Sequence, residues 1–444
     1  MKIFNVIILF AQKFEQLVSS NINLAILVKK LIPNKLILEK KIRKYQENIN
    51  NPAAEKSLLN IVNFAITNVP FYREKYGNKP VYSKEEFEEK IGFLTKEDLR
   101  ENRHKLLSSK FNEKDYELIS TGGSTGEPSV FYLPKNRFFK EWAYVFHAWA
   151  YRGYKNHIRA VLRNHRLDPN EKMRLNIFRN ELVFDAYRTE EKYFDFIYET
   201  MRKYNIKYFQ SYPNLAFLFF KHLSEKGKDL SFINGVFLSS ERFTDTQRQL
   251  LINRLKLPVT CIYGMSEQLV FAIDWDGSGA YEIMESYGYL ELIDNKGNVI
   301  NEPGREGEIV ATGYDNYGMP LIRYRTGDVS EYKQVQPKRI LKDIKGRKGQ
   351  IIIQPDGTTV SVTSLNLHGD LFELVDGLQY YQDTTDAVEI RIIPRKAPMD
   401  EVIKNKFLDY FRDRFHPEMK VIIKEVKELE RLSNGKLLTL ISKL

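Results

Sequence analysis

Short apolar runs of β-type residues alternate with stretches of helical periodicity from about residue 115 through the middle of the chain. This alternation favours a parallel sheet covered by helices, because consecutive parallel strands need a crossover connection that is usually a helix. We therefore expect an α/β fold of layered sheets and helices. The strand candidates of this alternation are residues 159–162, 207–210, 235–238 and 259–262, and two earlier β-type runs, 116–119 and 130–133, lie around a loop of small residues.

The regions on either side have other patterns. Residues 1–75 carry Ile, Leu and Val at three- and four-residue steps, which is typical of helices. Residues 287–311 indicate a hairpin around the turn at 295–298, and residues 355–357 mark a second hairpin turn. The later part of the chain thus departs from the strand-helix alternation.

The chain has 444 residues, which is too long for one hydrophobic core. We expect a large N-terminal domain at 1–345, with layered α/β sheets, a β-rich subdomain and a helical leader at 1–75. We expect a small, mobile α+β domain at 346–444, joined near the glycine-rich residues 345–349. Its predicted strands are 387–393 and 420–426, and its predicted helix is 400–415.

Charge and cysteine content narrow the class of protein. The formal charge is +10, but the lysines and arginines are scattered, so a solvated basic surface explains them and no nucleic-acid partner is expected. The single cysteine, Cys261, rules out an internal disulfide and agrees with a cytoplasmic location. The apolar residues 4–10 are too few for a transmembrane segment, which leaves peripheral contact with a membrane open.

A loop rich in small residues is the strongest chemical signal. Residues 120–128 contain three glycines and four hydroxyl side chains, which let the backbone turn tightly and present donors to a phosphate. The glycine spacing and the lysine of a Walker loop are missing. A flexible connection is the alternative interpretation of this loop.

Four motifs in a fixed order carry a resemblance to a known family. They are STGGSTGEPSVF from Ser120, YGMSE at Tyr263 to Glu267, RYRTGD at Arg323 to Asp328, and NGK at Asn434 to Lys436. In sequence and spacing they resemble the acyl-adenylate-forming (ANL) superfamily. The branch is that of phenylacetate-CoA ligase, including CapK-like relatives of polysaccharide biosynthesis. NVPFYREKYG at 68–77 and FLTKEDLREN at 93–102 are weaker similarities to it.

The resemblance implies ATP and Mg²⁺ as cofactors and assigns most of the site. The implied phosphate-binding residues are Ser120, Thr121, Gly122, Gly123, Ser124, Thr125 and Gly126. The other implied nucleotide-binding residues are Ser240, Glu241, Tyr263, Gly264, Met265, Ser266, Asp328 and Arg347. The implied catalytic residues are Lys436 and Glu267, and Glu267 is also the implied metal ligand.

These assignments suit the chemistry, because attack of a carboxylate on the α-phosphate brings anions together and the site must neutralise them. Each residue also has a simpler interpretation. Glu267 is otherwise a surface carboxylate, Asp328 a turn residue after a glycine, and Lys436 a surface lysine after an Asn-Gly turn. Near Lys436 the sequence departs from the family, since Arg431 and Leu432 replace its usual Pro and Arg.

The acid itself is less visible in the sequence. Residues 138–154 are predicted to be a helix, and the resemblance places Tyr144, His147 and Tyr263 near the acyl group. A histidine on such a helix is otherwise packed in the core. Arg163 and His165, which follow a strand, are further candidates.

The sequence leaves three functions open. The first is an enzyme that forms acyl-AMP from ATP and a carboxylate and transfers the acyl group to coenzyme A. The second uses the same adenylation but transfers to a sugar amine or hydroxyl. The third is a non-catalytic nucleotide- or nucleic-acid-binding protein that uses the basic surface.

Overall fold

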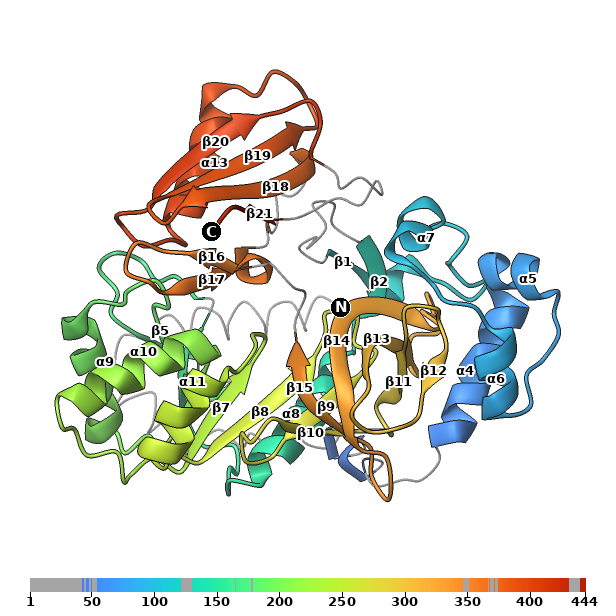
Figure 1. The fold of residues 1–444 in the computed structure, drawn as a ribbon, viewed down its shortest axis with the longest axis horizontal. Coiled ribbons are helices and arrows are strands. Elements are labelled where there is room, and N and C mark those ends of the chain that lie inside the picture. Colours follow the sequence, from blue (N-terminus) through green and yellow to red (C-terminus); the bar gives the residue numbers. More distant parts are fainter. Residues whose placement is uncertain are drawn as a thin grey trace, which may run out of the picture. The chain divides into compact units, whose positions relative to one another are not determined.

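The computed structural model forms two compact units, and each is considered by itself (Figure 1). The first unit comprises Met1–Asn51, Arg137–Tyr263 and Ala272–Glu282, and the second comprises Pro52–Asn136, Gly264–Phe271 and Ile283–Leu444. The structure describes residues 42–43, 45–47, 49, 54–120, 130–163, 165–176, 179–345, 351–365, 367, 371, 374–430 and 440–444.

The first unit contains a largely parallel sheet. Its strand order is β10-β9-β8-β7-β6-β3-β5-β4, and β8, β7, β6, β3 and β5 pair in parallel. The short β4 pairs antiparallel with β5 at one edge. The bounds are β3 Arg159–Leu162, β4 Arg174–Asn176, β5 Glu181–Phe184, β6 Tyr208–Ser211, β7 Gly235–Ser239, β8 Val259–Gly264, β9 Phe271–Asp274 and β10 Ala280–Ile283.

Helices cover both faces of this parallel sheet. Phe219 of α10 stacks on Phe209 of β6 at 4.9 Å between ring centroids, and Trp149 of α8 stacks on Phe237 of β7 at 4.6 Å. Phe237 pairs with Gln210, the neighbour of Phe209, so the two phenylalanines point to opposite faces. The helices are α8 Phe138–Ala150, α9 Glu191–Lys203, α10 Pro213–Glu225 and α11 Asp245–Arg248, followed by a π-helical turn at Gln249–Arg254.

The second unit begins with short helices and contains antiparallel strands in the order β12-β11-β13-β14-β15. Thr95 and Asp98 form a capping box that fixes the start of α7. The helices are α4 Ala54–Asn68, α5 Pro70–Tyr76, α6 Lys84–Lys90, α7 Lys96–Glu101 and a 3₁₀ turn at Glu113–Asp115. The strands are β11 Gly288–Ile293, β12 Val299–Ile300, β13 Glu306–Gly313, β14 Tyr324–Gln334, β15 Ile340–Lys345 and a separate hairpin of β1 Tyr116–Ser120 and β2 Val130–Pro134.

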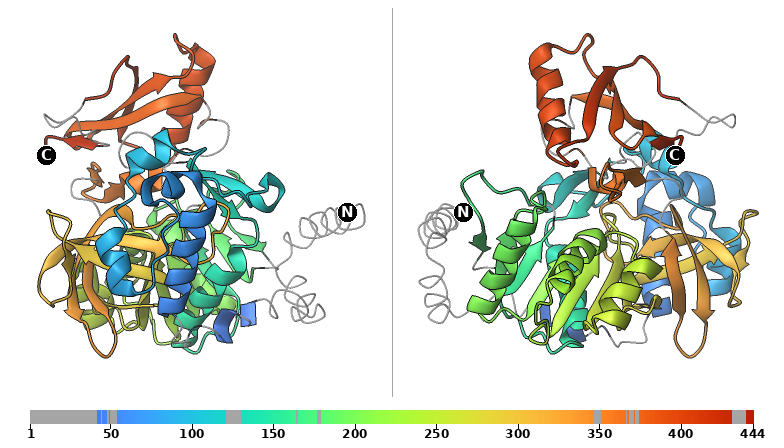
Figure 2. Two further views of the ribbon diagram at one scale, coloured as in Figure 1. Left: turned by 90° about the vertical axis from the view of Figure 1, so that its right-hand side faces the viewer. Right: turned by 60° about the vertical axis from the view of Figure 1, so that its left-hand side comes forward.

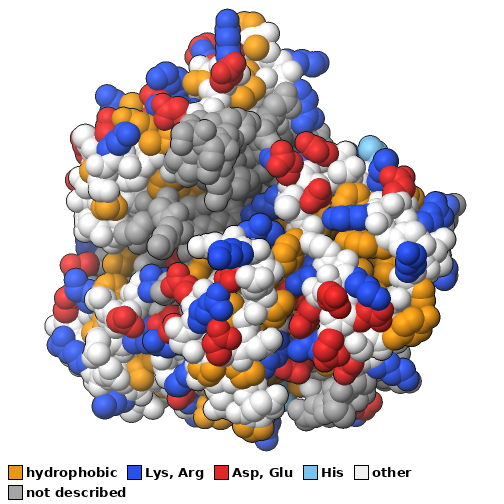
Figure 3. All heavy atoms as spheres, turned by 45° about the vertical axis from the view of Figure 1, so that its right-hand side comes forward, with side chains coloured by type: hydrophobic (Ala, Val, Ile, Leu, Met, Phe, Trp, Pro, Cys, Tyr) orange, Lys and Arg blue, Asp and Glu red, His pale blue; other side chains and the backbone are white. Residues whose placement is uncertain are grey.

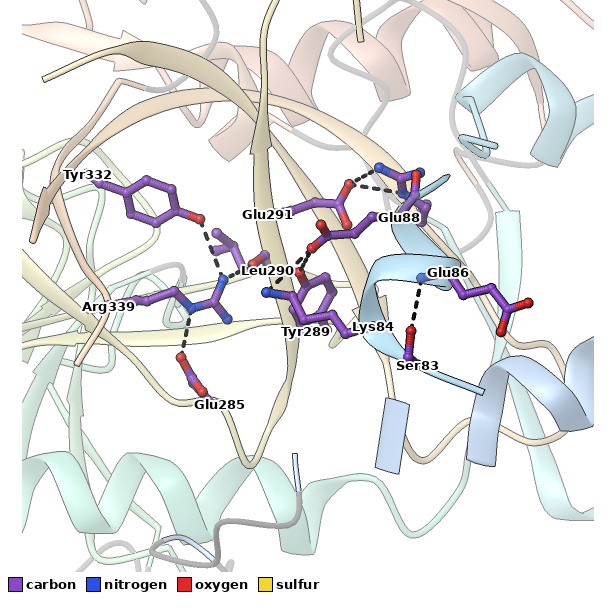
Figure 4. Close-up of polar contacts among 11 residues, drawn as sticks. Ser83, Lys84, Glu86, Glu88, Glu285, Tyr289, Leu290, Glu291, Tyr332 and Arg339 are labelled. Atoms are coloured by element: carbon purple, nitrogen blue, oxygen red, sulfur yellow. Dashed lines mark hydrogen bonds and ion pairs between the residues drawn. The ribbon is translucent and has the colours of Figure 1, made fainter. Parts of the chain in front are cut away.

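A polar network fastens α6 to β11 (Figure 4). The Tyr289 hydroxyl donates a hydrogen bond to Glu88, which also lies 3.5 Å from the Lys84 ammonium. Arg339 donates through Nε to Glu285 at 2.7 Å. Desolvation raises the pKa of Tyr289 well above its usual range. Because these charged and hydroxyl groups are paired with one another, the network stabilises the fold and offers little to a ligand.

The last part of the second unit has its own small sheet in the order β20-β19-β18-β21. Phe407 and Phe411 of α13 are fully buried in its core. The hairpin of β16 and β17 joins it through Gln382, whose side chain accepts from the Ile353 N–H at 2.9 Å. The bounds are β16 Ile351–Ile353, β17 Thr359–Ser361, a 3₁₀ turn at Val362–Leu365, β18 Val375–Thr384, β19 Ala387–Pro394, α13 Glu401–Arg412, β20 Lys420–Glu425 and β21 Leu440–Ser442.

The predicted fold class is confirmed, since the chain has layered α/β structure and a smaller sheet near its end. The division at 345 and 346 and the mobility of the later part stay predictions. Acidic and basic side chains are interspersed on the face shown in Figure 3, in keeping with scattered charge. None of the helices described here combines the length and apolar character needed to cross a bilayer. Residues 1–41 lie outside the described part.

Candidate functional site

Several predicted site residues lie outside the residues that the structure describes. Ser120 ends β1, but its side chain is not described. The predicted residues outside the described part are Thr121, Gly122, Gly123, Ser124, Thr125, Gly126, Arg347 and Lys436. Their assigned roles stay predictions.

In the first unit, predicted residues gather at the carboxyl edge of the parallel strands. Arg163 follows β3, Ser240 and Glu241 follow β7, and Tyr263 lies near the end of β8. Ser239 pairs with the residue before Tyr263, so Ser240 and Tyr263 come next at the same edge. Open α/β sheets bind ligands outside the carboxyl ends of their strands. The location therefore suits a binding site. The right-hand view of Figure 2 shows this part of the chain in green, with helices beside the strands.

Arg163 reaches across this edge. It is half-buried, and its Nη1 and Nη2 donate to the hydroxyls of Ser239 and Ser240, each at 3.2 Å. Since β6 separates β3 from β7, the side chain crosses the end of β6, where it lies 5.0 Å from the ring centre of Tyr212. Ser240 has a φ of 71°, a strained conformation for a residue other than glycine and one that clusters at functional sites.

Glu241 directly follows Ser240 and supplies a carboxyl group next to this arrangement. Its side chain accepts from the Asn214 N–H at 3.4 Å. Desolvation raises its pKa to about 7, against the lowering effects of that N–H and of Arg163. Glu241 therefore changes its charge near neutral pH and is suited to meet a polar group of a ligand.

Tyr144 and His147 lie on α8. Tyr144 is almost completely buried, at 2% exposure, and His147 is half-buried. The His147 ring packs edge-on against Trp275 at 5.6 Å, and the Trp275 carbonyl accepts from Thr260 near the start of β8. His147 thus lies toward the amino end of β8, whereas Tyr263 lies at its carboxyl end. Their substrate-binding roles stay predictions.

In the second unit, Glu267 is held in place at the end of the YGMSE motif. Gly264 ends β8, Met265 and Ser266 lead into a turn, and Glu267 is 6% exposed. The Tyr324 hydroxyl donates to Glu267 Oε1 at 3.3 Å. Tyr324 belongs to RYRTGD, so two of the four motifs meet at this carboxylate.

Two facing glycines fix the segment after Glu267. Gly288 of β11 pairs with Gly313 of β13. A Cβ at Gly288 would come within 1.8 Å of the Leu269 carbonyl oxygen, and one at Gly313 within 2.9 Å of the Leu269 side chain. Only glycine at Gly288 lets the backbone after Glu267 lie this close to the strand.

Asp328 follows an irregular part of β14. The pairing of β13 with β14 shifts register between Glu308 and Val310, and Gly327 has a φ of 81°. The Gly327 N–H donates to Glu308 Oε1 at 3.1 Å instead of to the ladder. Such a bulge re-aims side chains and is common beside active sites. The ribose-binding role of Asp328 stays a prediction.

Arg323, the first residue of RYRTGD, is a structural residue. It is 3% exposed, forms an ion pair with Glu291, and donates to the carbonyls of Glu88 and Ile91. Its guanidinium also lies 4.3 Å from the ring centre of Phe93. These contacts hold the beginning of β14 and hence the segment that carries Asp328.

The carboxylate of Glu267 is the predicted ligand of Mg²⁺. Within the described part of the chain, no group of three or more His, Cys, Asp or Glu side chains is arranged to hold a metal ion. Glu267 alone still fits, because nucleotide-bound Mg²⁺ takes one or two protein carboxylates and completes its shell with phosphate oxygens and water.

Some residues at the carboxyl edge were missed in the sequence. Tyr212 and Asn214 directly follow β6, and Ser239 ends β7. Their position immediately after predicted parallel strands is the signal that would have found them.

Solved structures with a similar fold include a CoA ligase in complex with acyl-AMP. A 2-hydroxyisobutyryl-CoA ligase in complex with 2-HIB-AMP and CoA has a TM-score of 0.54 at 16% identity, covering 88% of this chain and 91% of that one. The same ligase with R3-HIB-AMP has a TM-score of 0.50 at 15% identity, covering 88% and 92%. The chain therefore has the fold of the adenylate-forming ligases.

Sequence relatives indicate which branch of the adenylate-forming ligases this chain resembles. Protein CapK of Staphylococcus aureus is 24% identical over 330 residues, which cover 70% of each chain. A phenylacetate-coenzyme A ligase of Pseudomonas putida is 24% identical over 354 residues, covering 74% of this chain and 78% of that ligase. No family model matches the chain. The resemblance to the phenylacetate-CoA ligase branch and its CapK-like relatives is confirmed, and these homologues and fold neighbours include acid-CoA ligases that form adenylates.

Proposed function

We propose that the chain uses ATP to activate a carboxylate as acyl-AMP, with release of pyrophosphate, and then transfers the acyl group to coenzyme A. The contact between Tyr324 and Glu267 carries this proposal, because it joins two separate motifs of the family at one buried carboxylate. The fold shared with ligases solved with acyl-AMP supports it.

The residues would divide the work as follows. The loop at Ser120 to Gly126 binds the β- and γ-phosphates, and Asp328 accepts hydrogen bonds from the ribose hydroxyls. Tyr263 lies against the adenine. Glu267 would hold Mg²⁺, which neutralises charge on the phosphates. Lys436 stabilises the transition state of adenylation by placing a positive charge between the carboxylate and the α-phosphate.

A sugar amine or hydroxyl is the alternative acceptor. It is kept because the sequence motifs resemble those of CapK-like relatives of polysaccharide biosynthesis, and Protein CapK matches across 70% of this chain. Both versions share the first half-reaction. The cytoplasmic location stays a prediction.

Exchange of labelled pyrophosphate into ATP, screened over a panel of carboxylic acids, tests the first half-reaction. We expect exchange that depends on one class of acid, and product formation that stops when coenzyme A is omitted. Product that forms without coenzyme A but with an amino sugar would favour the alternative acceptor. Absence of exchange with every acid would refute the proposal.

Lys436 gives a sharper test of the site. Lys436→Ala should abolish exchange while ATP binding persists, because the lysine acts mainly in the transition state. Lys443→Ala, a matched change at an exposed lysine near the same end of the chain, should leave exchange intact. Full exchange by Lys436→Ala would remove the catalytic role of Lys436.

A further inference from the structure

Two arginines flank β3 in very different environments. Arg159 begins the strand, is fully buried and forms an ion pair with the Glu181 carboxylate. Arg163 follows the strand and is only half-buried. Its terminal nitrogens donate to the neutral hydroxyls of Ser239 and Ser240. The charge of Arg159 is therefore compensated by a carboxylate, whereas Arg163 is hydrogen-bonded to two neutral hydroxyls and acts on the Glu241 carboxyl only by its charge.

The surroundings of Arg163 leave its charge available. Among the described residues, no carboxylate forms an ion pair with it. The Tyr212 ring lies beneath the guanidinium, a stacking that orients the flat fork. The nearby Glu241 has a pKa raised to about 7 by desolvation, so it is partly neutral near pH 7.

His165, two residues after Arg163, lies at the same edge. Its pKa is lowered first by desolvation and further by the positive charges of Arg163, Arg179 and Arg174, while Glu181 opposes them. Arg174 is paired with Glu171, so Arg163 is the cation of this set that is placed to attract an anion at the end of β3.

We infer that Arg163, held in place by the Ser239 and Ser240 hydroxyls, binds a second anionic oxygen group of the acid substrate. The acid that the chain activates would therefore be a dicarboxylate or a comparable dianion. A guanidinium fork matches a carboxylate in a bidentate manner, and the contacts with the two hydroxyls fix the direction in which the fork points. Because this subsite concerns the acid to be activated, it rests on the proposed function.

Pyrophosphate exchange with matched pairs of acids tests the subsite. The pairs are hexanoate with adipate, pentanoate with glutarate, and benzoate with terephthalate. We expect the wild type to favour the dianion of a pair in kcat/KM. Arg163→Gln should lower this preference by about 10- to 100-fold, the effect of losing a hydrogen bond to a charged group. Arg163→Lys should retain part of it.

Two comparisons distinguish the subsite from other roles of Arg163. Arg202→Gln removes an exposed arginine of α9 that pairs with Asp229 at 3.3 Å, and it should keep the wild-type preference. The KM for ATP should change less than threefold in Arg163→Gln, by our order-of-magnitude expectation. The inference would be overturned if the wild type preferred the monocarboxylates and Arg163→Gln showed the same preference. It would also be overturned if Arg163→Gln changed the KM for ATP or coenzyme A more than the KM for the acid.

A binding measurement separates this inference from the proposed function. If no acid supports exchange, the proposed function fails, and calorimetric titration with adipate, glutarate and terephthalate then decides the subsite. Binding of one of these that weakens at least about tenfold in Arg163→Gln supports the subsite. Equal binding to both proteins, or none to either, overturns it.

Discussion

Gly288→Ala should impair adenylation by displacing Glu267. The new Cβ would lie 1.8 Å from the Leu269 carbonyl oxygen, and ordinary contact begins near 3.4 Å, so the backbone must separate by about 1.6 Å. Leu269 lies two residues after Glu267. A misplacement of about 1 Å in a catalytic group can lower the rate about 100-fold, and we expect a loss of this size in kcat/KM for pyrophosphate exchange.

Gly313→Ala is the matched control, because it changes the glycine that pairs with Gly288. Its Cβ would meet the end of the Leu269 side chain at 2.9 Å, which a rotamer change can relieve. A strained rotamer costs about 0.5–1.5 kcal/mol, so the expected loss is below about tenfold.

Urea denaturation of both variants shows whether the loss reflects unfolding. Overpacking by one methyl group should cost about 1–3 kcal/mol in the free energy of unfolding at Gly288, which leaves the protein largely folded. The assay should include a titration with Mg²⁺, whose half-saturating concentration should rise in Gly288→Ala. A folded Gly288→Ala with exchange no weaker than that of Gly313→Ala would refute the role assigned to Glu267.

Three further variants probe other contacts. Tyr324→Phe removes the hydrogen bond to Glu267 and should raise the half-saturating Mg²⁺ concentration for exchange about fivefold, which corresponds to about 1 kcal/mol. An unchanged half-saturating concentration would contradict a role for this contact. The pKa of Asp274 is raised to about 7 by desolvation, so the folded chain keeps a proton that the unfolded chain loses, and stability falls as the pH rises from about 4 to 7. In urea denaturation measured from about pH 4 to 7, Asp274→Asn should lose up to about 4 kcal/mol of this decrease in the free energy of unfolding. A pH dependence identical to that of the wild type would contradict the raised pKa of Asp274. Arg323→Met leaves Glu291 buried without its guanidinium and should cost about 3–5 kcal/mol in the free energy of unfolding, whereas a loss below about 1 kcal/mol would show that the pair is dispensable.

The parallel strands could be predicted because each is a short apolar run. The predicted 207–210, 235–238 and 259–262 correspond to Tyr208–Ser211, Gly235–Ser239 and Val259–Gly264. The long β14 could not be found in this way, since YRTGDVSEYKQ has few apolar residues and owes its strand conformation to β13 and β15. The helix expected at 138–154 ends at Ala150, and Gly153 then turns the chain with a φ of 72°.

The candidate site could likewise be predicted from the sequence only in part. The motifs singled out Glu267 and Asp328, whose roles stay predictions, because their residue types and spacing resemble those of the family. The contact of Arg163 with Ser239 depends on which strands lie side by side, which the sequence does not state. The need for glycine at Gly288 likewise follows from the approach of Leu269 to β11 and not from any local pattern.

Transfer of an isotopic label tests the central claim most directly. The acid that supports exchange is prepared with oxygen-18 in its carboxylate and incubated with ATP, Mg²⁺ and the acyl acceptor. Attack of that carboxylate on the α-phosphorus, followed by loss of the acyl group, should leave one labelled oxygen in AMP. Unlabelled AMP, or ADP together with labelled inorganic phosphate, would contradict the formation of an acyl adenylate.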